Sequence, residues 1–207
     1  MKNTPIDKYS ALVDSGRLLS DSGQKEAIEC LNELYLELTR LSWKQSLRPL
    51  KRYFPNLFAA KKKNSVRGLY LCGGVGRGKT MLMDMFYSCL PQGMGQRYHF
   101  HRFMRRVHEE LTSRRGTKDP IKDIAEQFAL ETKVICFDEF YVSDIADAMI
   151  LGELLKWLFD REVILVATSN SEPKNLYPNG LQRSKFLPAI DLLYKHTNLF
   201  LVLSDQD

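Results

Sequence analysis

A glycine-rich stretch, Gly73-Gly-Val-Gly-Arg-Gly-Lys79-Thr80, has the residue types needed to hold a phosphate chain. It fits the pattern G-x-x-x-x-G-K-[ST] at every fixed position. Glycines let the backbone curl so that successive N–H groups point inward, and a helix starting near Gly78 would add the positive end of its dipole. Lys79 would then contact the β- and γ-phosphates of a nucleotide, and the Thr80 hydroxyl would ligate Mg²⁺. We expect nucleotide contacts from Gly73, Gly74, Val75, Gly76, Arg77, Gly78, Lys79, Thr80 and Met81.

Two adjacent carboxylates, Asp138 and Glu139, follow the apolar run Val134-Ile-Cys-Phe. If this run is a strand of a parallel sheet, its end lies beside the phosphate loop. Asp138 is then suited to hold Mg²⁺, directly or through water, and Glu139 to orient and deprotonate an attacking water. The alternative is a strand that finishes in solvated acids. The pair turns a nucleotide-binding pattern into one that predicts ATP hydrolysis.

Two further polar residues are candidates for the reaction. Asn170 follows the apolar run Val163–Ala167 and could hydrogen-bond the γ-phosphate or the lytic water, although a strand-end Asn is commonly only a turn residue. Arg183 lies thirteen positions further on and could reach a neighbouring subunit's γ-phosphate, or simply be a surface arginine. With Lys79 and Glu139, these two complete the predicted catalytic set.

The elements that must position these residues alternate between strand and helix. We expect strands at Gly68–Cys72, Arg97–His101, Lys133–Phe137, Val163–Ala167 and Leu199–Leu203. We expect helices at Lys79–Leu90, Phe103–Arg114, Ile121–Leu130, Asp144–Phe159 and Pro188–Tyr194. This alternation predicts an α/β fold in which helices cover both faces of a mostly parallel sheet.

The N-terminal part has a different pattern. Residues 22 to about 40 form an amphipathic helix by their spacing of apolar residues, and Ser42–Asn64 resembles an irregular connector whose Lys61–Lys63 run is a solvated face. We therefore divide the chain into a helical extension with its connector, 1–64, and a nucleotide-binding core, 65–207. Gln24, in that helix, either contacts the adenine edge or faces solvent.

The composition excludes some classes of protein and leaves several classes of ligand open. Thirty basic and twenty-five acidic residues leave a formal charge of +5, which suits a nucleotide, a nucleic acid or an acidic protein surface. Four dispersed cysteines argue against a disulfide framework or a structural zinc site. The most apolar long stretch, Ile145 to Phe159, is too short and too charged to span a bilayer. No secretory signal is visible after Met1, so we expect a cytoplasmic protein.

The predicted strand Arg97–His101 and the residues after it carry side chains that could serve a special role. His99 and His101 would alternate along it and share one face. The residues that follow, Arg102 to Met104, either form a loop facing the pore of a ring or bury Phe103 in the core.

The joined motifs resemble one family. Four segments carry the resemblance to the ZapE family of bacterial cell-division ATPases, which is related to a mitochondrial AFG-like ATPase group: Arg67–Asp84, Tyr98–Leu111, Cys136–Met149 and Asn179–Ile190. It implies a P-loop NTPase of AAA+ type with strand order 5-1-4-3-2, Asn170 as the sensor-1 residue and Arg183 as a trans-acting arginine finger. Members of the family continue into a helical lid with a sensor-2 arginine, whereas this sequence stops at Asp207, so the expectation is either a truncated sequence or a chain without the lid.

The resemblance also implies a biological role. It predicts Mg²⁺-dependent ATP hydrolysis that destabilises polymers of the tubulin-like division protein FtsZ at the Z-ring, and a nucleotide-dependent homo-oligomer is a further expectation. Two alternatives stay open at this point. One is a nucleic-acid-associated module of the helicase-loader kind, although no stretch interleaves aromatic and basic residues as base-stacking surfaces do. The other is an ATP-gated binding module without turnover.

Overall fold

The fold is built on one parallel five-stranded sheet. In the computed structural model, which describes residues 4–46 and 66–203, the strands are β1 (Gly68–Cys72), β2 (Gly95–His99), β3 (Val134–Asp138), β4 (Ile164–Ser169) and β5 (Thr197–Leu201). Their order is β2-β3-β4-β1-β5, and each neighbouring pair is parallel. This is the predicted order 5-1-4-3-2 read from the other edge, so the expected P-loop fold is confirmed. Its consequence for the site is that β4 lies between β1 and β3.

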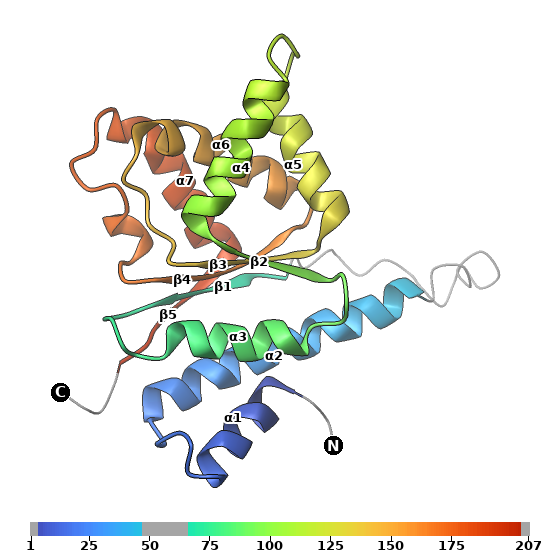
Figure 1. Cartoon of the computed structure of the whole chain (residues 1–207), viewed down its shortest axis with the longest axis vertical. Coiled ribbons are helices and arrows are strands. Elements are labelled where there is room, and N and C mark those ends of the chain that lie inside the picture. Colours follow the sequence, from blue (N-terminus) through green and yellow to red (C-terminus); the bar gives the residue numbers. More distant parts are fainter. Residues whose placement is uncertain (1–3, 47–65, 204–207) are drawn as a thin grey trace.

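Helices cover both faces of the sheet, as Figure 1 shows. Below the sheet in that view lie α1 (Pro5–Asp14), α2 (Ser22–Ser46) and α3 (Lys79–Cys89). Above it lie α4 (Phe100–Ser113), α5 (Pro120–Glu131), α6 (Ile145–Asp160) and α7 (Arg183–His196), and a short 3₁₀ helix, η3 (Pro173–Asn175), follows β4.

The side chains of β1 alternate between two separate apolar cores, one on each face of the sheet. In β1, Leu69 and Leu71 join the core on the α2–α3 side, whereas Tyr70 and Cys72 join the core on the α4–α7 side. This follows from the two-residue period of a strand. Both β1 and β3 are buried throughout, which explains why their sequences are continuously apolar until Asp138.

The region around β2 differs from the prediction. The strand lies two residues earlier than expected, and α4 begins at Phe100, directly after His99. His101 therefore belongs to a helix, and the expected alternation of the two histidines along a strand is wrong; their rings stack instead, with centroids 6.0 Å apart. Phe103 and Met104 are fully buried in α4, so the buried alternative holds and the pore-facing loop is wrong. The physical reason is the spacing of Phe100, Phe103 and Val107, which places one apolar stripe against the sheet.

One helix was not predicted, and several other boundaries differ from the prediction. Helix α1 was not predicted, although Thr4 and Asp7 form a capping box around Pro5 at its first turn. Helix α2 continues to Ser46, so the start of the expected connector is helical, and residues 47–64 of that connector lie outside the described residues. Helix α7 starts at Arg183 rather than Pro188, and β5 starts two residues before Leu199. Pro188 is the sixth residue of α7, where it has no N–H to donate to the carbonyl of Ser184, and its presence suggested a false helix start.

Candidate nucleotide-binding site

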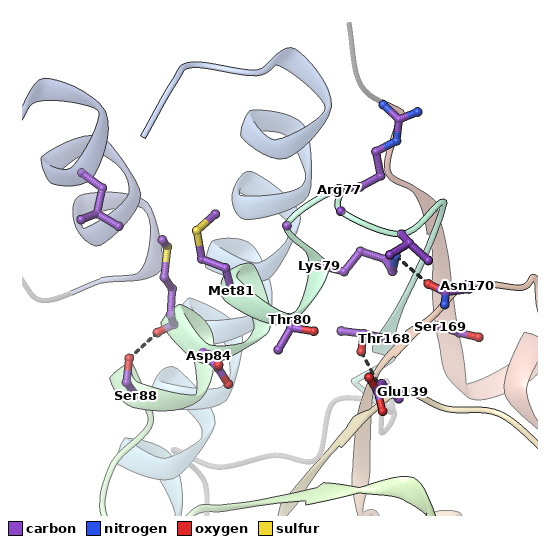
Figure 2. A pocket seen from close by; sticks show the side chains of 15 residues that line it. Arg77, Lys79, Thr80, Met81, Asp84, Ser88, Glu139, Thr168, Ser169 and Asn170 are labelled. Carbon is purple, nitrogen blue, oxygen red and sulfur yellow. Dashed lines mark hydrogen bonds between the residues drawn. The ribbon is translucent and has the colours of Figure 1, made fainter. Parts of the chain in front are cut away.

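A cavity of about 880 Å³ opens at the carboxyl edge of the sheet, where the phosphate loop leaves β1. Figure 2 shows the side chains around it, with Thr80 between Met81 on one side and Glu139 and Asn170 on the other. The lining comes from α1, the phosphate loop, α3 and the ends of β3 and β4: Leu12, Val75, Gly76, Arg77, Gly78, Lys79, Thr80, Met81, Asp84, Met85, Ser88, Glu139, Thr168, Ser169 and Asn170.

Two glycines of the loop have conformations that another residue would strain. Gly78 precedes α3 as its N-cap with φ +79°. Gly73 has φ +154°, and a Cβ built on it would lie 2.6 Å from the carbonyl oxygen of Val202. A side chain at either position would force the backbone out of the shape that turns its N–H groups toward the cavity. The sequence pattern and the geometry therefore agree at this loop.

Lys79 is held by oxygen atoms on both sides of the cavity. Its Nζ donates to the carbonyl oxygens of Gly73 (2.9 Å) and Gly74 (2.6 Å) and to Oδ1 of Asn170 (3.0 Å). Burial lowers the pKa of this ammonium from its usual value. These three oxygen atoms hold the ammonium in a buried position, where its attraction for an anionic phosphate would be stronger than in water.

Asp138 is the most buried acid of the site, with 3% of its surface exposed. Its Oδ1 accepts hydrogen bonds from the Thr80 hydroxyl (2.9 Å) and the Thr168 hydroxyl (2.8 Å). A carboxylate and a hydroxyl oxygen so close together form the hard-oxygen pair that Mg²⁺ prefers, so these residues fit the expected ion. Thr80 and Asp138 are the two residues that would hold it.

Sequence reasoning missed the basic partner of this acid. Arg97 of β2 donates from Nη2 to Oδ2 of Asp138 (2.9 Å), and its Nε lies 2.6 Å from Oδ1 of Asp84 on α3. The second approach is an ion-pair contact rather than an aligned hydrogen bond. An arginine in the middle of a short sheet strand was the signal that could have identified it, because such a residue needs an acidic partner.

Glu139 occupies a left-handed backbone position, with φ +53°. Residues with side chains adopt this region at a cost of about 1–3 kcal/mol, so the neighbouring structure must enforce it. Here β4 does so: the Glu139 N–H donates to the Thr168 hydroxyl (3.2 Å), and the Phe140 N–H donates to the Thr168 carbonyl (2.7 Å). The turn leaves the Glu139 side chain exposed at the cavity wall.

The two remaining predicted residues lie in different places. Asn170 follows β4, lines the cavity and contacts Lys79. Arg183 begins α7, where its Nη2 donates to the carbonyl oxygen of Lys174 (2.7 Å), and it is not among the residues that line the cavity. One chain therefore brings together Lys79, Thr80, Asp138, Glu139 and Asn170. The catalytic roles of these residues and of Arg183 stay predictions.

Comparison with known proteins identifies the family. The model of the AFG1-like ATPase family matches residues 3–207. The chain belongs to this family. It is 50% identical over 205 residues to the cell division protein ZapE of Escherichia coli, a match that covers 95% of this chain and 53% of that protein. It is 47% identical over 151 residues to lactation elevated protein 1 homolog B of Danio rerio, covering 68% of this chain and 30% of that protein.

These matches confirm the resemblance to the ZapE family that the four motif segments indicated. The chain spans about half the length of its ZapE relative. Among solved structures, DnaI superposes with a TM-score of 0.59 at 14% identity, covering 90% of this chain and 88% of DnaI. At this identity the likeness concerns the fold alone. Within residues 4–46 and 66–203, no helix combines the length and the apolar character needed to cross a bilayer.

Proposed function

We propose that this AFG1-like family member hydrolyses Mg²⁺·ATP and uses the energy to remodel a protein partner in bacterial cell division. One observation carries the first half: at the same edge of the sheet the loop lysine donates to Asn170 and the loop threonine donates to the acid that ends β3. The division of the chain into an extension, 1–64, and a core, 65–207, belongs to the same proposal. The core would bind and hydrolyse the nucleotide.

Each residue has a role that its surroundings suit. The loop amides and Lys79 would hold the phosphates, and Thr80 and Asp138 would hold the ion that neutralises developing charge. Glu139 is the general base, because its carboxylate is at the cavity wall and only its backbone is tied to β4. Asn170 would orient the water or the γ-phosphate when Lys79 turns from it to the nucleotide.

Arg183 would act on the active site of a neighbouring subunit. Within one chain it contacts Lys174 rather than the cavity, which suits a residue that serves a second copy. The nucleotide-dependent homo-oligomer expected from the sequence follows from this role. ATPase rate per subunit should therefore rise with protein concentration, and the Arg183→Ala variant should lose that rise.

The partner is proposed from relationship. The E. coli relative is a cell division protein, and the family resemblance points to FtsZ at the division site as the polymer that is destabilised. We infer a cytoplasmic location with recruitment to that site. Sedimentation of FtsZ polymers with and without Mg²⁺·ATP and this protein tests the inference, and unchanged polymer mass would reject FtsZ as partner.

The decisive test of catalysis is Glu139→Gln. We expect unchanged affinity for ATP and a fall in turnover of at least about a hundredfold, the range of a lost general base. Glu109→Gln is the matched control, because it makes the same chemical change on an exposed face of α4. Turnover in Glu139→Gln equal to that of the control would remove Glu139 from its role. Binding without turnover in the wild type at every protein concentration would favour the ATP-gated module.

A further inference from the structure

We propose that Gln24 is the residue that selects adenine, so that the site binds ATP in preference to GTP; this rests on the proposed function. Gln24 lies in the first turn of α2, a helix that carries no residue of the phosphate loop. Its side chain nevertheless reaches that loop. A Cβ built on Gly78 would lie 3.1 Å from Nε2 of Gln24 and 3.4 Å from Cε of Met81.

The position agrees with where a base must lie. The phosphates occupy the loop and the N-terminus of α3, with the γ-phosphate toward Lys79 and Glu139. The base therefore extends to the opposite side of Thr80, the side on which Met81 projects toward the N-terminal helices in Figure 2. Met81 gives this end an apolar wall, whereas Glu139 and Asn170 lie at the other end, and Leu12 and Met85 are further apolar residues of the lining. An apolar wall with one amide beside it is a typical base pocket.

The amide has an unused acceptor. Oε1 of Gln24 is buried and has no hydrogen-bond partner among the described residues. Gln24 does not itself line the cavity, but its amide lies against Gly78, and Gly78 and Met81 do line it. Buried polar atoms in proteins are nearly always paired, so we infer that the amide rotates to pair with a base bound beside these two residues. This also argues against the alternative in which Gln24 only faces solvent.

The backbone of Gln24 is fixed, which lets its side chain discriminate. Its N–H donates to Oδ1 of Asp21 (2.8 Å), and the preceding Gly23 lies against the backbone of Leu203, whose carbonyl oxygen would be 1.8 Å from a Cβ built there. Only a glycine permits such an approach. The first turn of α2 is thus clamped between Asp21 and the segment after β5.

A carboxamide distinguishes the two purines by its donor and acceptor. Its oxygen accepts from the adenine N6 amino group while its NH₂ donates to N7, a two-bond pairing. Guanine presents acceptors at both O6 and N7. The amide NH₂ can donate to one of them, but the amide oxygen then faces the other acceptor and cannot bond to it. The thioether of Met81 supplies the polarizable contact with the face of the ring.

The test is competition binding against a fluorescent ATP analogue, with ATP, GTP and 7-deaza-ATP as competitors. We expect the wild type to prefer ATP over GTP by about tenfold or more, since two hydrogen bonds of this kind correspond to that factor. Gln24→Ala should weaken ATP binding about tenfold and GTP binding less than twofold. The 7-deaza analogue, which lacks N7, should bind more weakly than ATP to the wild type but equally well to the variant.

Controls separate recognition from folding. Gln92→Ala removes an exposed glutamine before β2 and should leave all three affinities unchanged. Gln24→Leu keeps the volume and should match Gln24→Ala if the amide itself reads the base, and circular dichroism checks that each variant is folded. Equal binding of ATP and GTP by the wild type, or equal losses for both in Gln24→Ala, would overturn this inference alone. Binding of neither nucleotide to the wild type would reject the proposed function and this inference with it.

Discussion

Arg97 supports a prediction about stability that is independent of nucleotide. Its guanidinium is the only cationic group within hydrogen-bonding distance of the Asp138 carboxylate among the described residues. His99 is nearby, but its Nδ1 is 3.8 Å from Oδ2, too far for a hydrogen bond. Arg97→Met keeps the aliphatic stem and removes the charge, so Asp138 would remain buried without its cation.

The magnitude follows from burial. Removing one partner of a buried ion pair costs about 3–5 kcal/mol because the other charge stays desolvated. Two features reduce the cost here: the Arg97 side chain is 25% exposed, and Asp138 keeps its hydrogen bonds from Thr80 and Thr168. We therefore expect Arg97→Met to lower the free energy of unfolding by about 2 kcal/mol. For a domain of this size the corresponding fall in Tm is about 4–8 °C.

The assay is equilibrium unfolding in urea, followed by circular dichroism without nucleotide. Arg105→Met is the matched control, because Arg105 is 74% exposed and its nearest acid, Glu109, is 3.8 Å away. Exposed pairs of this kind contribute at most about 0.5 kcal/mol. The slope of the unfolding free energy against urea should stay the same in both variants.

A double variant tests the cause. If the cost arises from the unpaired charge on Asp138, then adding Asp138→Asn to Arg97→Met should restore about 1 kcal/mol of the lost free energy of unfolding. The effects of substitutions at two residues in contact do not simply add. Equal stability of Arg97→Met and Arg105→Met would refute the reasoning. So would a double variant whose loss is the sum of the two single losses.

Two further predictions concern the core and pH. Phe103→Ala should lower the free energy of unfolding by about 3–5 kcal/mol, because the ring is fully buried. Leu130→Ala is the control, because Leu130 is 89% exposed and its loss should change the free energy of unfolding little. Similar losses for the two variants in urea titrations would contradict the packing. Burial, with the positive charge of Lys195, lowers the pKa of His196 from 6.5, so the unfolded chain takes up its proton first and stability falls as pH drops below 6.5. His196→Phe keeps the stack on Phe159 and should lose stability less steeply between pH 7 and 5; parallel pH profiles would reject this.

The phosphate loop and the acid at the end of β3 were predicted because each depends on local pattern, whereas the strand order was implied by the resemblance to the ZapE family. The fixed positions of Gly73–Thr80 and the apolar runs of β1 and β3 can be recognised without knowing any neighbour. The predicted boundary between strand and helix was wrong where a strand pattern and a helix pattern overlap. Around His99 the residues suit a strand by their types and a helix by their spacing, and burial of Phe100 and Phe103 decided in favour of the helix.

What the sequence did not predict depends on contacts between distant elements. Arg97 and Asp138 are 41 positions apart, and only the pairing of β2 with β3 brings them together. Helix α1 was missed for a different reason: it is ten residues long, and its stability depends on packing against α2 and α3. Its capping box was present in the sequence, but it is a weak signal without that packing.

The position of β4 between β1 and β3 explains why this site is a connected network rather than a set of separate groups. Asn170, after β4, contacts Lys79 of the loop, while Thr168 donates to Asp138 and accepts from the N–H of Glu139. One strand end therefore contacts the loop lysine, the buried acid that ends β3 and the turn that carries Glu139. Thr168 thus bonds to both the Asp138 carboxylate and the backbone of the Glu139 turn. This connection requires only adjacent strand ends, which is why the strand order matters as much as the motifs.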